Sequence, residues 1–439
     1  MVNSQNNKIK WIAIQPLTGG MYLGAEEAIG HPAEFILSFK GLTDVKYNKE
    51  GEMTSVANEY NLLEYLSLKN RLPKNGYYVM DRNMFDSDYE DTDFPIYDVN
   101  EFDVRDKLID TDLDLVVAVP VCSGLSMVTS AKSDTKDSRN CNMLFISNFT
   151  LSTIKPKIYI FENAPTFMGP RGEELREQFE EMALKYGYSI LYYKTDTKFH
   201  ENCQQRPRTF VIFYKHNKNE NQVPFLFDFE DKQISIVDFF NNIDNDNLTQ
   251  NEPIKSSPHN YIVIDYIKNR FGKDDWKNQE RINGSLMKFI IEKNLLDDLI
   301  SFIENECTNY SEDIKSKTLK YINHIKYKKS LDMNYYGDDV CYFKKVFPSV
   351  QFRSIPNMLH PSGERICSCR EYLSLMGMPE DFTLYGNSTN LPKIGQNVPV
   401  KTAKFIVEQA IKHLNNWNDE RGTETNVKFQ DNIKKKIIF

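Results

Sequence analysis

The chain has 439 residues, of which 40% are hydrophobic and 13% aromatic, and a formal net charge of −8. This length allows two domains, and the composition excludes a disordered chain. Because no stretch approaches the ~18–20 uncharged apolar residues of a membrane span, and residues 1–17 contain no signal-like apolar run, we expect a cytoplasmic protein without a membrane partner.

Seven cysteines are scattered along the chain. An odd, dispersed set in a large chain is typical of reduced thiols rather than of a disulfide framework. Only Cys367 and Cys369 are close in sequence, and a C-x-C pair without a second pair nearby is a poor zinc site. The sequence therefore predicts no metal centre.

The first half alternates β-branched apolar runs with helical stretches, which is typical of an α/β fold with a sheet covered by helices. An amphipathic helix is expected at residues 172–187. The expected strands are residues 9–15, 33–39, 77–80, 96–99, 113–119, 157–163, 188–193 and 208–215.

After residue 215 the pattern changes to helical segments such as 284–306, without alternating strands. We expect a second, smaller and mainly helical or irregular domain at 216–350, and a return segment at 351–425 whose closing helix, 398–414, packs on the first domain. Residues 426–439 are expected to form a solvated tail.

A basic strip, residues 315–329, holds six lysines and no acid. Such a strip could follow nucleic-acid phosphates, or it could be the solvated face of a helix, and the sequence favours neither interpretation. Tyr321 and Tyr327 are expected to pack beneath it.

Several polar residues fall where predicted strands end. Ligands of open parallel sheets gather beyond the carboxyl ends of the strands. Each residue has an ordinary explanation alone, since a free cysteine, for example, is often a core residue. Their joint placement predicts one site, formed by Gly19, Gly20, Asp98, Cys122, Glu162, Asn163, Gln204, Arg206 and Arg208.

Three motifs in this order carry a resemblance: "PVCSG" at 120–124, "FENAP" at 161–165 and "QQRPR" at 204–208. They resemble the Pro-Pro-Cys-Gln, Glu-Asn-Val and Gln-x-Arg-x-Arg motifs of the cytosine-C5 DNA methyltransferase family. "CSCREYLSLMGMPEDF" and "KIGQNVPVKTAKFI" downstream, and "TGGMYLGAEEAIG" near the start, are similar to further motifs of that family.

The resemblance implies a Rossmann-like catalytic domain with a mixed sheet at 1–215 that uses S-adenosylmethionine (SAM), and a target-recognition domain at 216–350. Cys122 would add to C6 of a flipped cytosine as nucleophile. Glu162 would contact N3 and the exocyclic amine, in a protonated or proton-sharing form. Arg208 would hold O2, and Arg206 would brace the site or a phosphate.

The resemblance also implies binding residues. The expected cofactor-binding residues are Gly19, Gly20, Asp98, Pro120, Gln396, Asn397 and Val398. The expected substrate-binding residues are Ser126, Asn163, Gln204, Lys326, Lys328 and Lys329. The acid that holds the ribose in this family is not evident, because Lys40 stands at the end of the second predicted strand and Asp81 is only a substitute.

We expect a monomer that binds double-stranded DNA, encoded by a bacterium or a phage. One alternative keeps the fold but acts on cytosine in RNA, or uses a modified SAM. The other is a catalytically silent module that only binds nucleic acid.

Overall fold

The protein is described by a computed structural model. The described residues are 8–40, 45–51, 53–56, 59–83, 112–120, 138–215, 226–243, 250–280, 282–333, 339–350, 357–385, 388–415 and 426–438.

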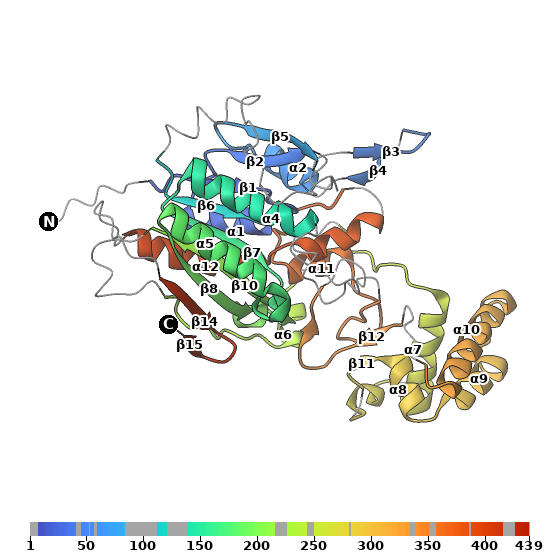
Figure 1. The fold of residues 1–439 in the computed structure, drawn as a ribbon. Helices are drawn as coiled ribbons and strands as arrows, with labels where there is room; N and C mark the ends of the chain where they lie inside the picture. Colours follow the sequence, from blue (N-terminus) through green and yellow to red (C-terminus); the bar gives the residue numbers. More distant parts are fainter. Residues whose placement is uncertain are drawn as a thin grey trace.

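A mixed sheet of nine strands among the described residues runs through the larger part of the molecule (Figure 1), in the order β15-β14-β8-β10-β7-β6-β1-β2-β5. β1 lies between β2 and β6 and is parallel to both, and β6 is parallel to β7. β10 is antiparallel to its neighbours β7 and β8. The strands are β1 (Trp11–Ile14), β2 (Ile36–Lys40), β5 (Tyr77–Asn83), β6 (Leu115–Ala118), β7 (Ile158–Asn163), β8 (Ser189–Asp196), β10 (Pro207–Tyr214), β14 (Val427–Asp431) and β15 (Lys436–Ile438).

Continuous apolar runs form the central strands. Every residue of β1, β6 and β7 is buried, which is typical of strands covered by helices on both faces. In Figure 1, α4 (Ser138–Phe149) and α5 (Glu173–Tyr186) lie in front of the sheet, and α1 (Gly20–Ile29) and α12 (Val400–Asn415) lie behind it. Each predicted strand has an observed counterpart except 96–99, which lies outside the described residues.

Helix α5 shows how the sequence sets an element's ends. Glu173 and Glu174 occupy its first turn, where carboxylates interact favourably with the positive end of the helix dipole. Gly187 ends it in the left-handed conformation, with φ +72°. The observed bounds therefore agree with the predicted helix at 172–187.

A second cluster of buried side chains lies outside the sheet, among the helices at the right of Figure 1. The predicted helix at 284–306 is two helices, because Asn294 adopts a left-handed φ of +56° between them. The helices are α7 (Pro258–Phe271), α8 (Leu286–Glu292), α9 (Leu296–Asn305) and α10 (Glu312–Ser330).

The two cores do not divide at the predicted boundaries. Phe227 and Phe240, after residue 215, belong to the core of the sheet. Leu359 and Ile366, after residue 350, belong to the second core. Residues at the start of the predicted second domain thus pack in the core of the sheet, and residues that follow the predicted second domain pack in the second core.

The prediction of a solvated tail at 426–439 is wrong. β14 pairs with β8 in parallel, and β15 pairs with β14, so the hairpin extends the sheet. The Gln430 side chain is fully buried and bonds both the N–H and the C=O of Phe227. The buried residues of this segment, Lys428, Gln430, Asp431 and Asn432, are polar, so the local sequence gives no sign of the pairing.

The remaining elements connect these layers. The other helices are α2 (Tyr60–Leu68), α6 (Ile236–Asn241) and α11 (Cys369–Leu375). The short strand pairs are β3 (Val45–Tyr47) with β4 (Met53–Val56), β9 (Gln204–Gln205) with β13 (Phe347–Pro348), and β11 (Gly284–Ser285) with β12 (Cys341–Tyr342). No helix in the described residues is long and apolar enough to cross a membrane.

Candidate active site

The carboxyl ends of β1, β6 and β7 meet at one edge of the sheet, where β10 begins. Ile14 pairs with Ala118, and Ala118 pairs with Phe161, so the carboxyl-terminal parts of these three strands lie side by side. Pro120, after β6, is buried at this edge. Cys122, Ser126 and Asp98 lie outside the described residues.

Glu162 and Arg208 face each other at this edge. Arg208 Nε lies 2.5 Å from Glu162 Oε1, and the two side chains are only 17% and 5% exposed. The antiparallel pairing of β10 with β7 sets this geometry, because Phe210 lies opposite Glu162. Arg208 also donates to its neighbour's carbonyl, Pro207 O, at 2.7 Å. The buried carboxylate is thus oriented by a cation, a partner that the sequence interpretation did not assign to it.

Asn163 and Gln204 bond mainly within the protein. Asn163 Oδ1 accepts the N–H of Ala164 at 2.7 Å, which holds the turn after β7. Gln204 Nε2 donates to Leu375 O at 3.0 Å, and its Oε1 accepts the N–H of Val350 at 3.0 Å. Both side chains are fully buried. These bonds give each a structural role, and substrate contact by either stays a prediction.

Arg206 is almost fully buried and joins two distant segments of the chain. Its NH1 donates to Val350 O at 2.6 Å and to Ser349 Oγ at 3.2 Å. Its NH2 donates to Gly395 O and Asn397 O, both at 2.8 Å. These bonds hold the two segments together, and whether Arg206 braces the site or a phosphate during the reaction stays a prediction.

The glycine turn after β1 is in contact with residues 397–398. Gly19 has a φ of +106°, a conformation that favours glycine. The Gly20 N–H donates to Asn397 Oδ1 at 2.6 Å. A Cβ on Gly20 would lie 1.8 Å from Val398 O, so no other residue fits there. Four predicted cofactor residues therefore lie together, and the Asn397 side chain is bonded to the glycine turn itself.

Gln396, another predicted cofactor residue, precedes this contact. Its Oε1 is buried and has no hydrogen-bond partner among the described residues. A buried acceptor without a partner is unfavourable in the protein alone, and it fits a site where a ligand supplies a donor.

Glu59, which the sequence interpretation missed, is a fully buried carboxyl group just before α2. Tyr77 donates its hydroxyl to Glu59 Oε2 at 3.0 Å, and the Leu17 N–H also interacts with the carboxyl group. Burial raises its pKa from about 4.5 to about 8. Leu17 belongs to the turn after β1, so this hydrogen bond connects Glu59 to that turn. A glutamate before a predicted helix gives no signal of burial in sequence.

Residues 82–412 match the family described as C-5 cytosine-specific DNA methylase, which is more than half of the chain. The chain belongs to this family. The predicted family is therefore confirmed.

Comparison with solved structures shows the fold of this methylase. The chain is similar to a "putative DNA modification methyltransferase encoded within prophage" from E. coli, with a TM-score of 0.52, 15% identity, and coverage of 93% of this chain and 99% of that one. An Entamoeba histolytica methyltransferase gives a TM-score of 0.49 at 12% identity, covering 93% and 99%. The first of these likenesses confirms the predicted mixed α/β fold class. The recognition role of the second domain stays a prediction.

One curated relative is similar over a short stretch. A "Putative type II methyltransferase" of Methanocaldococcus jannaschii is 33% identical over 88 residues, which are 20% of this chain. The match spans 27% of the length of that relative.

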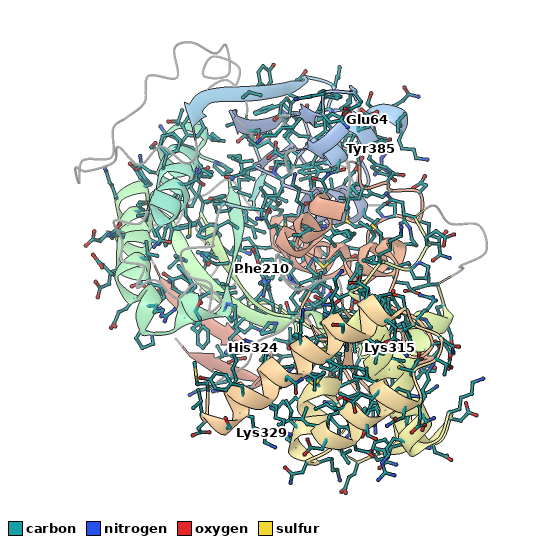
Figure 2. The ribbon with its side chains drawn as sticks, turned by 90° about the vertical axis from the view of Figure 1, so that its right-hand side faces the viewer. Glu64, Phe210, Lys315, His324, Lys329 and Tyr385 are labelled. Carbon is teal, nitrogen blue, oxygen red and sulfur yellow. The ribbon has the colours of Figure 1, made fainter. Side chains whose placement is uncertain are left out.

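The basic strip forms α10, which lies at the front of Figure 2, where Lys315, His324 and Lys329 are labelled. In Figure 1 this helix lies at the outer end of the second domain, away from the sheet. Lys326 forms an ion pair with Asp297, and Lys329 Nζ donates to Asn294 Oδ1 at 3.0 Å. These bonds favour the solvated-face interpretation.

The two tyrosines of α10 differ. Tyr321 donates its hydroxyl to Asp339 Oδ1 at 2.6 Å and packs on the second core. Tyr327 is 61% exposed, so the expectation that it packs beneath the strip is wrong.

Proposed function

We propose that this methylase transfers a methyl group from SAM to C5 of cytosine in double-stranded DNA, through a covalent bond between Cys122 and C6. The observation that carries the proposal is the buried Glu162–Arg208 pair at the edge of the sheet where the strand before Cys122 ends. A carboxylate and a guanidinium so placed can grip the polar edge of a pyrimidine ring.

The donor fits the neighbouring part of this edge. The chain leaves β1 toward β2 on one side and returns to β6 on the other, and ligands of open α/β sheets bind at such a switch point. Gly19 and Gly20 lie there, close to Gln396, whose Oε1 has no hydrogen-bond partner in the described part of the chain. SAM, when bound, supplies an electrophilic methyl group on a sulfonium sulfur.

Cys122 is the proposed nucleophile. Its thiolate would add to C6, and the electrons of the C5–C6 double bond would make C5 nucleophilic toward the methyl group, whose bond to the sulfonium sulfur breaks. Loss of the C5 proton would then expel the thiolate from C6 and restore the double bond. The cysteines whose side chains are described are poor alternatives, because burial raises their thiol pKa values above the usual range. These are Cys203, Cys341 and Cys369, each to about 12, together with Cys307 and Cys367.

Glu162 and Arg208 would act on the base. Arg208 would hold O2 and oppose negative charge that develops on the ring, while Glu162 would accept from the exocyclic amine and share a proton with N3. Because their ion pair already exists in the free protein, the two groups are oriented before the base arrives, and little reorganisation is needed. A base inside a duplex cannot reach them, so the cytosine must be flipped out.

The test is methyl transfer by the purified full chain. We expect release of tritium from C5-labelled mixed-sequence duplex DNA in the presence of SAM, and far less from RNA carrying the same label. Bisulfite sequencing of DNA from expressing cells would then identify the methylated site. Preferential release from RNA would contradict the choice of DNA.

A second assay tests the covalent step. An oligonucleotide with 5-fluorocytosine should become attached to the wild-type chain in a SAM-dependent manner, and not to a Cys122→Ala variant. Binding of DNA without attachment or turnover would instead identify a silent nucleic-acid-binding module.

A further inference from the structure

Arg206 lies where three parts of the chain converge. It stands between β9 and β10, two residues before Arg208 of the candidate active site. One side of its guanidinium bonds Ser349 and Val350, and the other bonds the carbonyls of Gly395 and Asn397. The guanidinium group is planar, always charged and carries several N–H donors, so it can bond both segments at once. A lysine has a single ammonium group and cannot do so.

The first of these segments leads back from the second domain. Tyr342 belongs to the second core, and only eight residues separate it from Val350. Between them, β13 pairs with β9, and the Val350 N–H bonds Gln204. A shift of the second domain relative to the sheet can therefore reach Val350, whose carbonyl Arg206 holds, through β13.

The second segment rests on the glycine turn. Thr18 Oγ1 donates to Lys393 O at 3.1 Å, and the Gly20 N–H donates to Asn397 Oδ1. Because Val398 O is in close contact with Gly20, residues 393–398 cannot move without moving the turn. Arg206 therefore reaches the donor side of the site through these residues.

We propose that Arg206 is a positioning residue that couples the second domain to the glycine turn, so that nucleic-acid binding and donor binding strengthen each other. The proposal rests on the proposed function, because it assigns the donor to Gly19–Gly20 and the nucleic acid to the second domain. Coupling between two binding sites is reciprocal, so either ligand can be used to measure it.

The test compares Arg206→Lys with a matched control, Arg370→Lys. Arg370 is also a fully buried arginine, and among the described residues its guanidinium donates to the carbonyls of Pro379 and Phe382, which lie outside residues 393–398. SAM affinity is measured by calorimetry, with and without mixed-sequence duplex DNA. Hydrogen–deuterium exchange is followed in peptides that cover residues 16–26. Both are recorded where circular dichroism shows each variant folded.

Arg206→Lys should weaken SAM binding about tenfold, since charge-assisted bonds to two carbonyls are lost, and DNA should no longer improve SAM affinity. Exchange at residues 16–26 should be faster than in the wild type. Arg370→Lys should match the wild type in all three measurements. If the two lysine variants behave alike, Arg206 is only a structural residue and the proposal is overturned.

The exchange measurement separates this proposal from the proposed function. If the wild-type chain binds no SAM, the proposed function fails. In that case, exchange at residues 16–26 that is faster in Arg206→Lys than in Arg370→Lys still supports the link between Arg206 and the glycine turn. Equal exchange in the two variants overturns that link. Should Arg206→Lys not fold, Asn397 gives the same test. Asn397→Asp keeps the acceptor for the Gly20 N–H and should exchange like the wild type, whereas Asn397→Ala should exchange faster, and equal exchange in both overturns the proposal.

Discussion

Replacing Glu59 by glutamine should make the protein more stable at neutral pH. Glu59 is fully buried, and burial raises its pKa from about 4.5 to about 8, so the folded protein holds it in the neutral form at pH 7. Glutamine keeps the shape of the side chain and a carbonyl oxygen that can accept the Tyr77 hydroxyl. The substitution removes the ionisation, and it replaces the second oxygen with an amide NH2 group.

The size of the effect follows from proton linkage. Between about pH 4.5 and pH 8 the unfolded chain gives up the Glu59 proton while the folded protein keeps it. The free energy of unfolding therefore falls as pH rises, by about 1.4 kcal/mol per pH unit. From pH 5 to pH 7 the loss is about 3 kcal/mol, a large share of the roughly 5–15 kcal/mol that stabilises a typical domain.

Urea unfolding at pH 5, 6, 7 and 8 measures this loss. The stability difference between Glu59→Gln and the wild type should be small at pH 5 and should grow by about 3 kcal/mol at pH 7, in favour of the variant. Glu64→Gln, in the helix that follows Glu59, is the control, because Glu64 is only partly buried and any pH trend that the two variants share does not come from the burial of Glu59. A pH-independent difference for Glu59→Gln, or a variant that becomes less stable as pH rises, would refute the reasoning.

Three further outcomes follow from the site. Cys122→Ser should lower methyl transfer more than about a hundredfold while SAM still binds, because a neutral hydroxyl is a weak nucleophile; a smaller loss contradicts the covalent mechanism. Glu162→Gln should slow single-turnover transfer more than it weakens DNA binding, and equal losses would make Glu162 a binding residue. Changing Lys326, Lys328 and Lys329 to alanine should leave the slope of log DNA affinity against log salt almost unchanged, since two of these ammonium groups are bonded within the protein. A slope smaller in magnitude by two or more would place α10 on the DNA backbone.

The sequence by itself determined the class of fold, the family and the main strands. Apolar, β-branched runs such as "LDLVVAV" and "KIYIFEN" are typical of strands in a sheet that helices cover on both faces. The order of the motifs along the chain predicted the family, which no single motif does. Glu162 and Arg208 were both predicted as site residues from that order, and the register of β7 and β10 brings them into contact. Local chemistry also set the ends of α5.

Only the tertiary structure decided which polar groups bond within the protein. Asn397 and Arg206 are polar residues near a predicted site, but close packing of residues 395–398 on Gly20 turns their hydrogen bonds inward. Glu59 and the β14–β15 hairpin gave no local signal, since the burial of the one and the strand pairing of the other depend on residues far away in sequence. Burial and hydrogen bonding between distant segments are properties of the packed chain, and a pattern of neighbouring residues does not contain them.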